Sequence, residues 1–135
     1  MFRRTRVLLH GVGLAASAAF REVLLFIGLY KLVAILYGIG LAIWPNKRVS
    51  LTRGLASVYE RAGELEIAER HFADLLELEP QDPISHWELG VVYEKLGKWD
   101  RAAERYEKAL TLGADLSNEF RDELRNRANR LKSRH

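Results

Sequence analysis

The chain has 135 residues, no cysteine and a formal net charge of +3, and 48% of its residues are hydrophobic. This hydrophobic share excludes an intrinsically disordered chain, and the lack of cysteine excludes disulfides and thiolate chemistry. The charge is segregated: residues 1–46 carry five Lys or Arg and one Glu (+4), residues 47–115 carry ten and fourteen (−4), and residues 116–135 carry six and three (+3).

Residues 1–22 form an N-terminal segment that is first basic and then apolar. Arg3, Arg4 and Arg6 precede an apolar stretch of 14 residues at positions 7–20. The stretch is read in three ways: as a cleaved secretory signal, as a second membrane-crossing helix, or as an interfacial or partner-packed helix. The last is favoured, because the stretch is too short to cross a bilayer as a straight helix and a cleaved signal seldom precedes another apolar span so closely.

Residues 23–44 are predicted to form a transmembrane helix, with Lys31 as their only charged residue. A helix of this length covers about 33 Å at about 1.5 Å per residue, against about 30 Å of bilayer hydrocarbon. Trp44 suits the membrane interface, and the linker at 45–48 adds a helix-stopping proline and a basic pair. We therefore expect a single-pass membrane protein.

Lys31 is the predicted intramembrane contact. A charge near the centre of a span costs about 2.5–3.5 kcal/mol, so the side chain either reaches back to the headgroups, which is favoured, or pairs with another subunit. The basic residues near the span are almost balanced, with four before it and three after it. This small excess favours repeats on the outer side, which for a bacterial inner-membrane protein is the periplasm, and a second crossing by residues 7–20 would reverse this orientation.

A pattern of small, aromatic and turn residues occurs in residues 49–82 and again in residues 83–116, at an interval of 34. A fixed period of this length indicates a solenoid of stacked helix pairs. Gly63 and Gly97 are placed to end the first helix of each pair, and Asp82 is placed to cap the second pair. The other matched positions are Leu55 with Leu89, Tyr59 with Tyr93, Ala68 with Ala102, and Phe72 with Tyr106.

These repeats resemble the tetratricopeptide repeat (TPR) family over about half of the chain. The second repeat carries the family pattern at Trp87, Leu89, Gly90, Tyr93, Gly97, Ala102, Tyr106 and Ala109, and the first at Leu55, Ala56, Tyr59, Gly63, Ala68, Phe72, Leu75 and Pro80. The departures are small: Trp87 lies one residue closer to Leu89 than is usual, Leu75 replaces a late alanine, and Ala114 stands where the first repeat has Pro80. The resemblance implies two helix-turn-helix repeats. Together with the transmembrane helix that is predicted before them, the expected fold is all-α.

Residues 117–135 are predicted to form a capping helix. Leu116, Phe120, Leu124, Ala128 and Leu131 advance in steps of three or four, so they share one helical face. Two repeats leave the end of their core uncovered, and an amphipathic helix there would close it. The basic outer face is read as solvated. Nucleic acid is a disfavoured partner, because no aromatic residues are interleaved with the basic ones.

The resemblance also implies a partner-binding groove lined by the first helix of each pair. The corresponding residues are Arg53, Ser57, Glu60, Arg61, Ile84, Trp87, Glu88, Val91, Glu94 and Lys95. Ile84, Trp87 and Val91 form an apolar anchor for a helix or peptide; alternatively, Trp87 packs on the capping helix or on a second copy. Ser57 and Glu88 stand where some family members use amides to clamp a C-terminal carboxylate, so recognition of chaperone tails is disfavoured.

Catalytic and metal-binding patterns are absent from the sequence. The histidines lack metal-ligand spacing except for a loose Asp82/His86 pair, which a helix start explains equally well. We therefore expect no enzyme activity, no metal and no cofactor.

The predicted function is that of a membrane-anchored TPR scaffold or adaptor that binds a protein partner close to the bilayer. The alternative is an accessory subunit of a larger membrane complex, with the transmembrane helix carrying the assembly. Two repeats are few for a stable array, so the sequence also predicts either a homo-oligomer or docking onto a larger protein.

Overall fold

The structure, a computed structural model, describes residues 28–134, and within that range it is helical with no strand. The predicted segment 1–22 and the first five residues of the predicted span lie outside the described residues. The elements are a helix at 28–43, the 3-10 helix η1 (Pro45–Lys47), α2 (Arg48–Arg61), α3 (Leu65–Leu78), α4 (Pro83–Lys95), α5 (Trp99–Leu112) and α6 (Asn118–Lys132).

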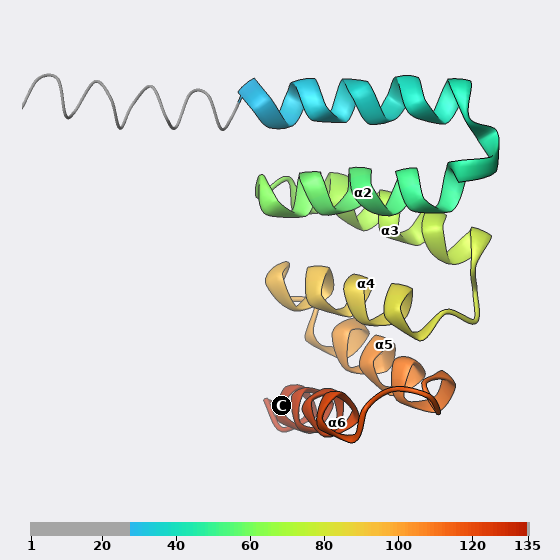
Figure 1. Cartoon of the computed structure of the whole chain (residues 1–135). Helices are drawn as coiled ribbons and strands as arrows, with labels where there is room; N and C mark the ends of the chain where they lie inside the picture. Colours follow the sequence, from blue (N-terminus) through green and yellow to red (C-terminus); the bar gives the residue numbers. More distant parts are fainter. Residues whose placement is uncertain (1–27, 135) are drawn as a thin grey trace, which may run out of the picture.

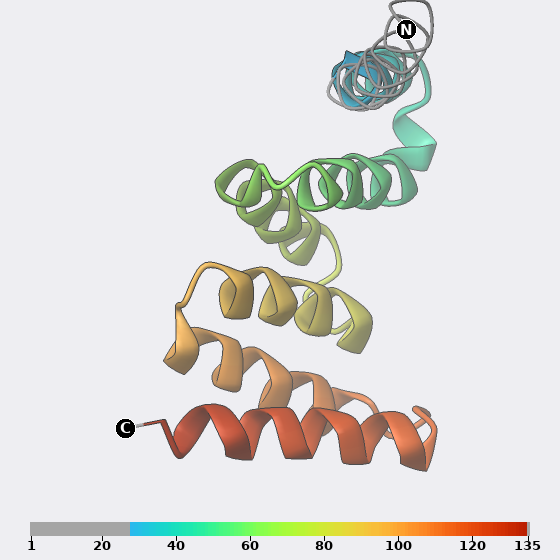
Figure 2. The same cartoon turned by 90° about the vertical axis from the view of Figure 1, so that its left-hand side faces the viewer.

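The helices stack in chain order as a series of hairpins (Figures 1 and 2). α2 packs on α3, α3 on α4, α4 on α5, and α5 on α6. This is the all-α solenoid that the sequence predicts, with one helix pair in each 34-residue repeat. The predicted linker at 45–48 is occupied by η1 and the first residue of α2.

The two predicted turn glycines lie at the ends of α2 and α4. Gly63 and Gly97 have φ angles of +82° and +72°, in the left-handed region that residues with a Cβ atom rarely adopt. The turns are alike: the amide of Glu64 donates to the Tyr59 carbonyl, and that of Lys98 to the Tyr93 carbonyl, both at 2.9 Å. Each glycine therefore ends one helix and lets the chain reverse into the next.

The core contains aliphatic, aromatic and small residues from each of the helices α2 to α6. Ala68 and Ala102 are fully buried, and so are the aromatic rings of Phe72 and Tyr106. Tyr106 lies so close to α4 that a Cβ atom added at Gly90 would be 2.7 Å from its Cε1. The alanines and Gly90 thus permit the close helix approach that the repeat pattern predicts.

α6 covers the end of this core as predicted. Ser117 caps the helix by accepting a hydrogen bond from the amide of Phe120 at 3.2 Å. Leu124, Ala128 and Leu131 are buried against the second repeat. The apolar stripe of α6 closes the solenoid, and its basic face is left outside.

The helix at 28–43 lies alongside α2, at the opposite end of the stack from α6 (Figures 1 and 2). Tyr30 donates a hydrogen bond to Glu64 Oε1 at 3.2 Å, and its ring meets Tyr59 edge-on at 6.3 Å. The ring of Tyr37 covers Gly54 of α2. Over residues 28–134, none of the helices combines the length and apolar character needed to span a bilayer. The predicted span at 23–44 is described only from residue 28, and it stays a prediction.

Candidate protein-binding site

Arg53 of α2 connects the first repeat to the second. Its guanidinium lies 2.7 Å from Glu88 Oε2, 2.8 Å from Asp82 Oδ2 and 3.7 Å from Glu79 Oε2. It also donates to Ser85 Oγ at 3.1 Å. One arginine therefore joins α2 to the start of α4, across a distance of one full repeat in sequence.

A second ion pair joins the other ends of the same two helices. Lys95 Nζ lies 2.7 Å from Glu60 Oε1. Four of the predicted groove residues, Arg53, Glu60, Glu88 and Lys95, therefore pair with one another. In both pairs the two opposite charges lie 35 residues apart in the sequence, close to the repeat period of 34. This spacing could have predicted the two ion pairs from the sequence, but the family pattern does not include it.

Asp82 and Glu88 share Arg53, but their acidities differ. Burial raises the pKa of Glu88 to about 7, although Arg53 acts in the opposite direction. Burial also acts to raise the pKa of Asp82, but hydrogen bonds from Ser85 and Arg53 outweigh it, so the Asp82 pKa is lowered. Asp82 is the permanent anion of this cluster, and Glu88 titrates close to neutral pH.

The predicted apolar anchor is half-buried in the structure. The ring of Trp87 meets Phe120 of α6 edge-on, with 5.3 Å between ring centroids. Ile84 and Val91 are also half-buried. Trp87 therefore adopts the alternative arrangement considered from the sequence, in which it packs on the capping helix.

An open pocket of about 290 Å³ lies between α4, the start of α5 and α6. Val91, Glu94 and Lys95 contribute to it from α4, as the predicted groove requires. Its remaining lining was not predicted from the sequence and consists of Trp99, Arg127 and Arg134. These residues come from α5, α6 and the turn after α6, so the repeat pattern could not have assigned them to the groove.

Glu94 organises the polar side of this pocket. It accepts a hydrogen bond from Tyr106 Oη at 2.6 Å, and it lies 3.6 Å from Arg127 and from Arg130. Arg134 is 4.6 Å from the centre of the Trp99 ring. The pocket thus combines an aromatic ring, an aliphatic side chain and several cations, which suits an extended peptide or a short helix.

Ser57 and Arg61 belong to the part of α2 that is nearer the N-terminal helix. Ser57 is half-buried, whereas Arg61 is exposed and lines a pocket of about 240 Å³ together with Tyr30 and Val33. The structure therefore places Arg61 beside the helix at 28–43, and not with the residues gathered around α4 and α6.

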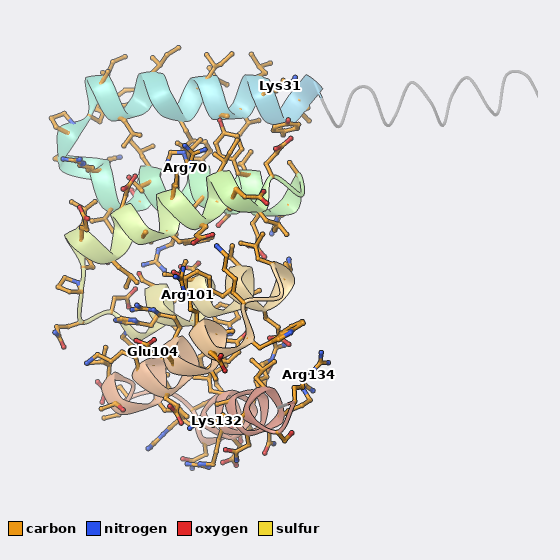
Figure 3. All side chains as sticks on the ribbon, turned by 180° about the vertical axis from the view of Figure 1, so that it is seen from behind. Lys31, Arg70, Arg101, Glu104, Lys132 and Arg134 are labelled. Carbon is orange, nitrogen blue, oxygen red and sulfur yellow. The ribbon has the colours of Figure 1, made fainter. Side chains whose placement is uncertain are left out.

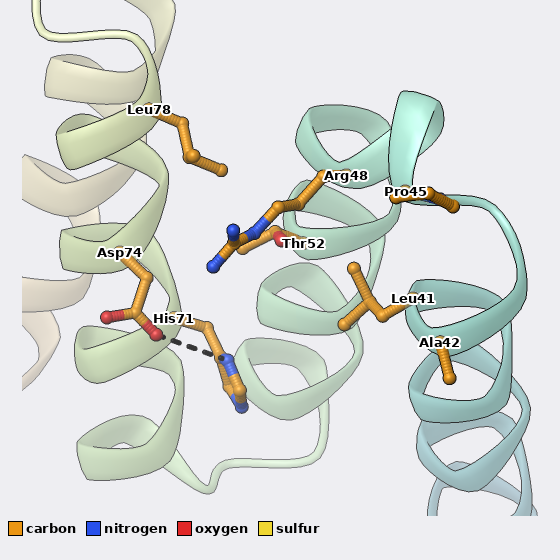
Figure 4. Close-up of a pocket in the computed structure, with 8 residues that line it drawn as sticks. All are labelled: Leu41, Ala42, Pro45, Arg48, Thr52, His71, Asp74 and Leu78. Atoms are coloured by element: carbon orange, nitrogen blue, oxygen red, sulfur yellow. Dashed lines mark ion pairs between the residues drawn. The ribbon is translucent and has the colours of Figure 1, made fainter.

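A larger pocket, of about 430 Å³, lies at the junction of the helix at 28–43, η1, α2 and α3 (Figure 4). The guanidinium of Arg48 and the ring of His71 line it, and His71 Nδ1 is 4.0 Å from Asp74. Burial lowers the pKa of His71. Across residues 28–134, His, Cys, Asp and Glu form no group of three that could hold a metal ion.

Lys31 is exposed near the start of the described helix, where Figure 3 labels it. It lies at the end of the solenoid remote from Lys132 and Arg134 in the same view. The pocket between α4 and α6 and the exposed Lys31 are therefore separate features of the molecule.

The sequence of the paired helices matches a known protein family. Residues 53–117 match the family described as tetratricopeptide repeat. The paired helices are therefore similar to TPR repeats. No curated protein sequence matches the chain.

Solved TPR structures share the fold. The first TPR of Spaghetti (RPAP3), bound to the HSP90 peptide SRMEEVD, is 25% identical, with a TM-score of 0.63 over 78% of this chain and 82% of the other. The Sgt2 TPR domain from Aspergillus fumigatus is 21% identical, with a TM-score of 0.63 over 89% and 72%. MamA from Desulfovibrio magneticus RS-1 is 14% identical, with a TM-score of 0.58 over 78% and 66%.

Proposed function

We propose that this protein is a TPR adaptor that binds a peptide or a short helix of a protein partner along α4 and α6. The observation that carries the proposal is the pocket lined by Val91, Lys95, Trp99 and Arg134. The first TPR of Spaghetti, which holds a peptide, supports the same use of the fold.

The N-terminal region tethers the adaptor to a membrane in this proposal. The support is the apolar sequence at 23–44, which has one charged residue, together with Trp44 and the basic pair that follow the helix. A tether of this kind raises the concentration of the groove near a membrane-bound partner. The proposed location is a bacterial inner membrane with the repeats on the periplasmic side.

A second candidate function is that of an accessory subunit held in a larger membrane complex by its N-terminal helix. The observation that favours it is Lys31, which is exposed and, within residues 28–134, has no ion-pair partner. In this case Lys31 would pair with another subunit, and the repeats would only dock on the soluble face of the complex.

The experiment is co-purification of partners with the full chain in a mild detergent. The groove variant is Val91→Ala with Lys95→Ala. Its matched control is Leu78→Ala with Lys108→Ala, two exposed positions that do not line the pocket between α4 and α6. If the protein is an adaptor, the groove variant should lose its partner, whereas the control variant and Lys31→Leu should keep it. Loss with Lys31→Leu alone would instead identify the accessory subunit.

A further inference from the structure

The helix at 28–43 has one face packed on the repeats and one face fully open. The open face and Trp44 contain large apolar side chains that are 49–59% exposed. These residues are Leu29, Leu32, Ile35, Leu36, Ile39, Ile43 and Trp44. Most of them follow steps of three and four along the helix, so they form one continuous stripe from the first described turn to the interfacial tryptophan.

Contacts on the opposite face hold the helix against α2. Tyr30 bonds to Glu64, Tyr37 covers Gly54, and the side chain of Leu51 lies 3.3 Å from the position of a Cβ atom at Gly40. Gly40 and Ala34 are buried. The small residues and tyrosines therefore fix which face is covered, and they direct the apolar stripe away from the solenoid.

This packing determines how the helix can meet a bilayer. The helix runs alongside α2, which carries Arg48, Arg53 and Arg61, and one of its own tyrosines is bonded to Glu64. If the docked helix crossed the hydrocarbon, it would draw these charged groups in with it, and each of them is costly there. A docked helix therefore lies parallel to the membrane surface, with only its open face in contact with the lipid.

The basic residues near the apolar stripe favour an anionic lipid surface, and not a second copy of the chain, as the partner that covers it. Lys31, Lys47 and Arg48 are exposed, form no ion pair within residues 28–134, and have no acidic residue among them from 28 to 48. A second copy docked in parallel would place Lys31 against Lys31. In the antiparallel arrangement Lys31 would approach the partner's basic end. Either dimer opposes like charges, whereas anionic headgroups neutralise them.

We infer that the open face of the 28–43 helix is an in-plane docking surface for an anionic bilayer, with Lys31 and Lys47 at headgroup level. This inference rests on the membrane attachment proposed above and adds its geometry. The solenoid then stands on the membrane through the 28–43 helix, with α2 as the nearest repeat helix and α6, which lines the α4–α6 pocket, farthest from the lipid (Figure 1). The groove is thereby presented to a partner away from the bilayer surface.

The test is a depth measurement on the full chain in vesicles of phosphatidylcholine and phosphatidylglycerol. The chain has no cysteine, so single nitroxide labels can be placed at Leu29→Cys, Leu36→Cys and Ile43→Cys, all of them exposed positions. Asn126→Cys on α6 is the matched control in water. Collision with oxygen and with a water-soluble nickel complex gives the depth of each label.

The expected result is the same shallow depth for the three labels on the open face, with Asn126→Cys in water. A crossing helix would instead give unequal depths, with Leu36→Cys, near the middle of the 23–44 span, deepest and Ile43→Cys, near its end, close to the interface. That result would overturn the in-plane geometry and leave the proposed membrane attachment standing. Spin–spin broadening without lipid would reject the lipid surface in favour of a second copy. All labels in water would overturn the attachment itself.

The basic residues provide a second measurement. Lys31→Gln with Lys47→Gln is expected to weaken vesicle binding of the full chain about fivefold for each charge removed, and only when phosphatidylglycerol is present. Lys108→Gln on α5 is the control. Equal binding of the double variant and the control would contradict the assignment of these cations to the headgroups.

Discussion

Tyr37 lies directly over the backbone of Gly54, where an added Cβ atom would come within 2.6 Å of the tyrosine Cζ and hydroxyl oxygen. Gly54→Ala is therefore expected to displace the Tyr37 ring and release the 28–43 helix from α2. Hydrogen exchange of residues 30–41 should accelerate, while exchange in α4 to α6 stays unchanged. Gly38→Ala is the control, because no atom lies within 4 Å of its added Cβ. Unchanged exchange in Gly54→Ala would show that the ring adjusts without undocking.

Gly90→Ala is expected to destabilise the second repeat. The new methyl group would lie 2.7 Å and 2.8 Å from two atoms of the fully buried Tyr106 ring, and 3.3 Å from Arg105 Cβ. Overpacking costs about 1–3 kcal/mol, against about 1 kcal/mol gained in helix propensity. A net loss of about 1 kcal/mol would lower the unfolding midpoint by about 4–8 °C in a domain of this size. Thermal unfolding followed by circular dichroism measures it, and a midpoint at or above that of the parent would be the contrary result.

Glu88→Gln is expected to change how stability depends on pH. The folded-state pKa of Glu88, about 7, is above its ordinary value of 4.5, so its contribution to stability is fully present below pH 4.5 and is lost as pH rises through 7. The variant lacks this titration. Its free energy of unfolding relative to the parent should therefore increase between pH 4.5 and 7. Comparison with the parent also removes the opposing titration of His71, whose pKa is lowered and which both proteins contain.

Denaturant unfolding at several pH values provides the measurement for Glu88. A difference between variant and parent that does not vary with pH would show that the ion pair with Arg53 offsets the burial of the carboxylate. Asp82→Asn should behave differently, because the pKa of Asp82 is lowered: its contribution is present above the ordinary value and is lost on acidification.

The contact between Trp87 and Phe120 is expected to couple α6 to the second repeat. Trp87→Ala and Phe120→Ala each remove one ring of an edge-to-face pair whose centroids are 5.3 Å apart. In a double-mutant cycle the coupling free energy should be about 0.5–1.5 kcal/mol. A cycle between Trp87→Ala and Leu51→Ala, which belong to separate contacts, supplies the control. Additive effects for Trp87 and Phe120 would refute the coupling.

Local sequence patterns determined the repeats. A glycine with positive φ, an aspartate N-cap and an apolar residue every third or fourth position each act within one helix or turn, so Gly63, Gly97 and Asp82 could be assigned without knowledge of the fold. The alanine and aromatic positions followed in the same way, because a repeat with a fixed period buries equivalent residues. The capping helix was also predictable from its own stripe.

Tertiary structure alone decided which side chains meet. The stacking of α2 on the second repeat pairs Arg53 with Glu88, and the path of α6 brings Phe120 onto Trp87. The period of a helix specifies its apolar face but not the partner of that face. For the N-terminal helix, hydropathy counts apolar residues and cannot distinguish exposed leucines from tyrosines and glycines that pack on protein. That distinction depends on the contact between Tyr37 and Gly54, residues that only the folded chain brings together.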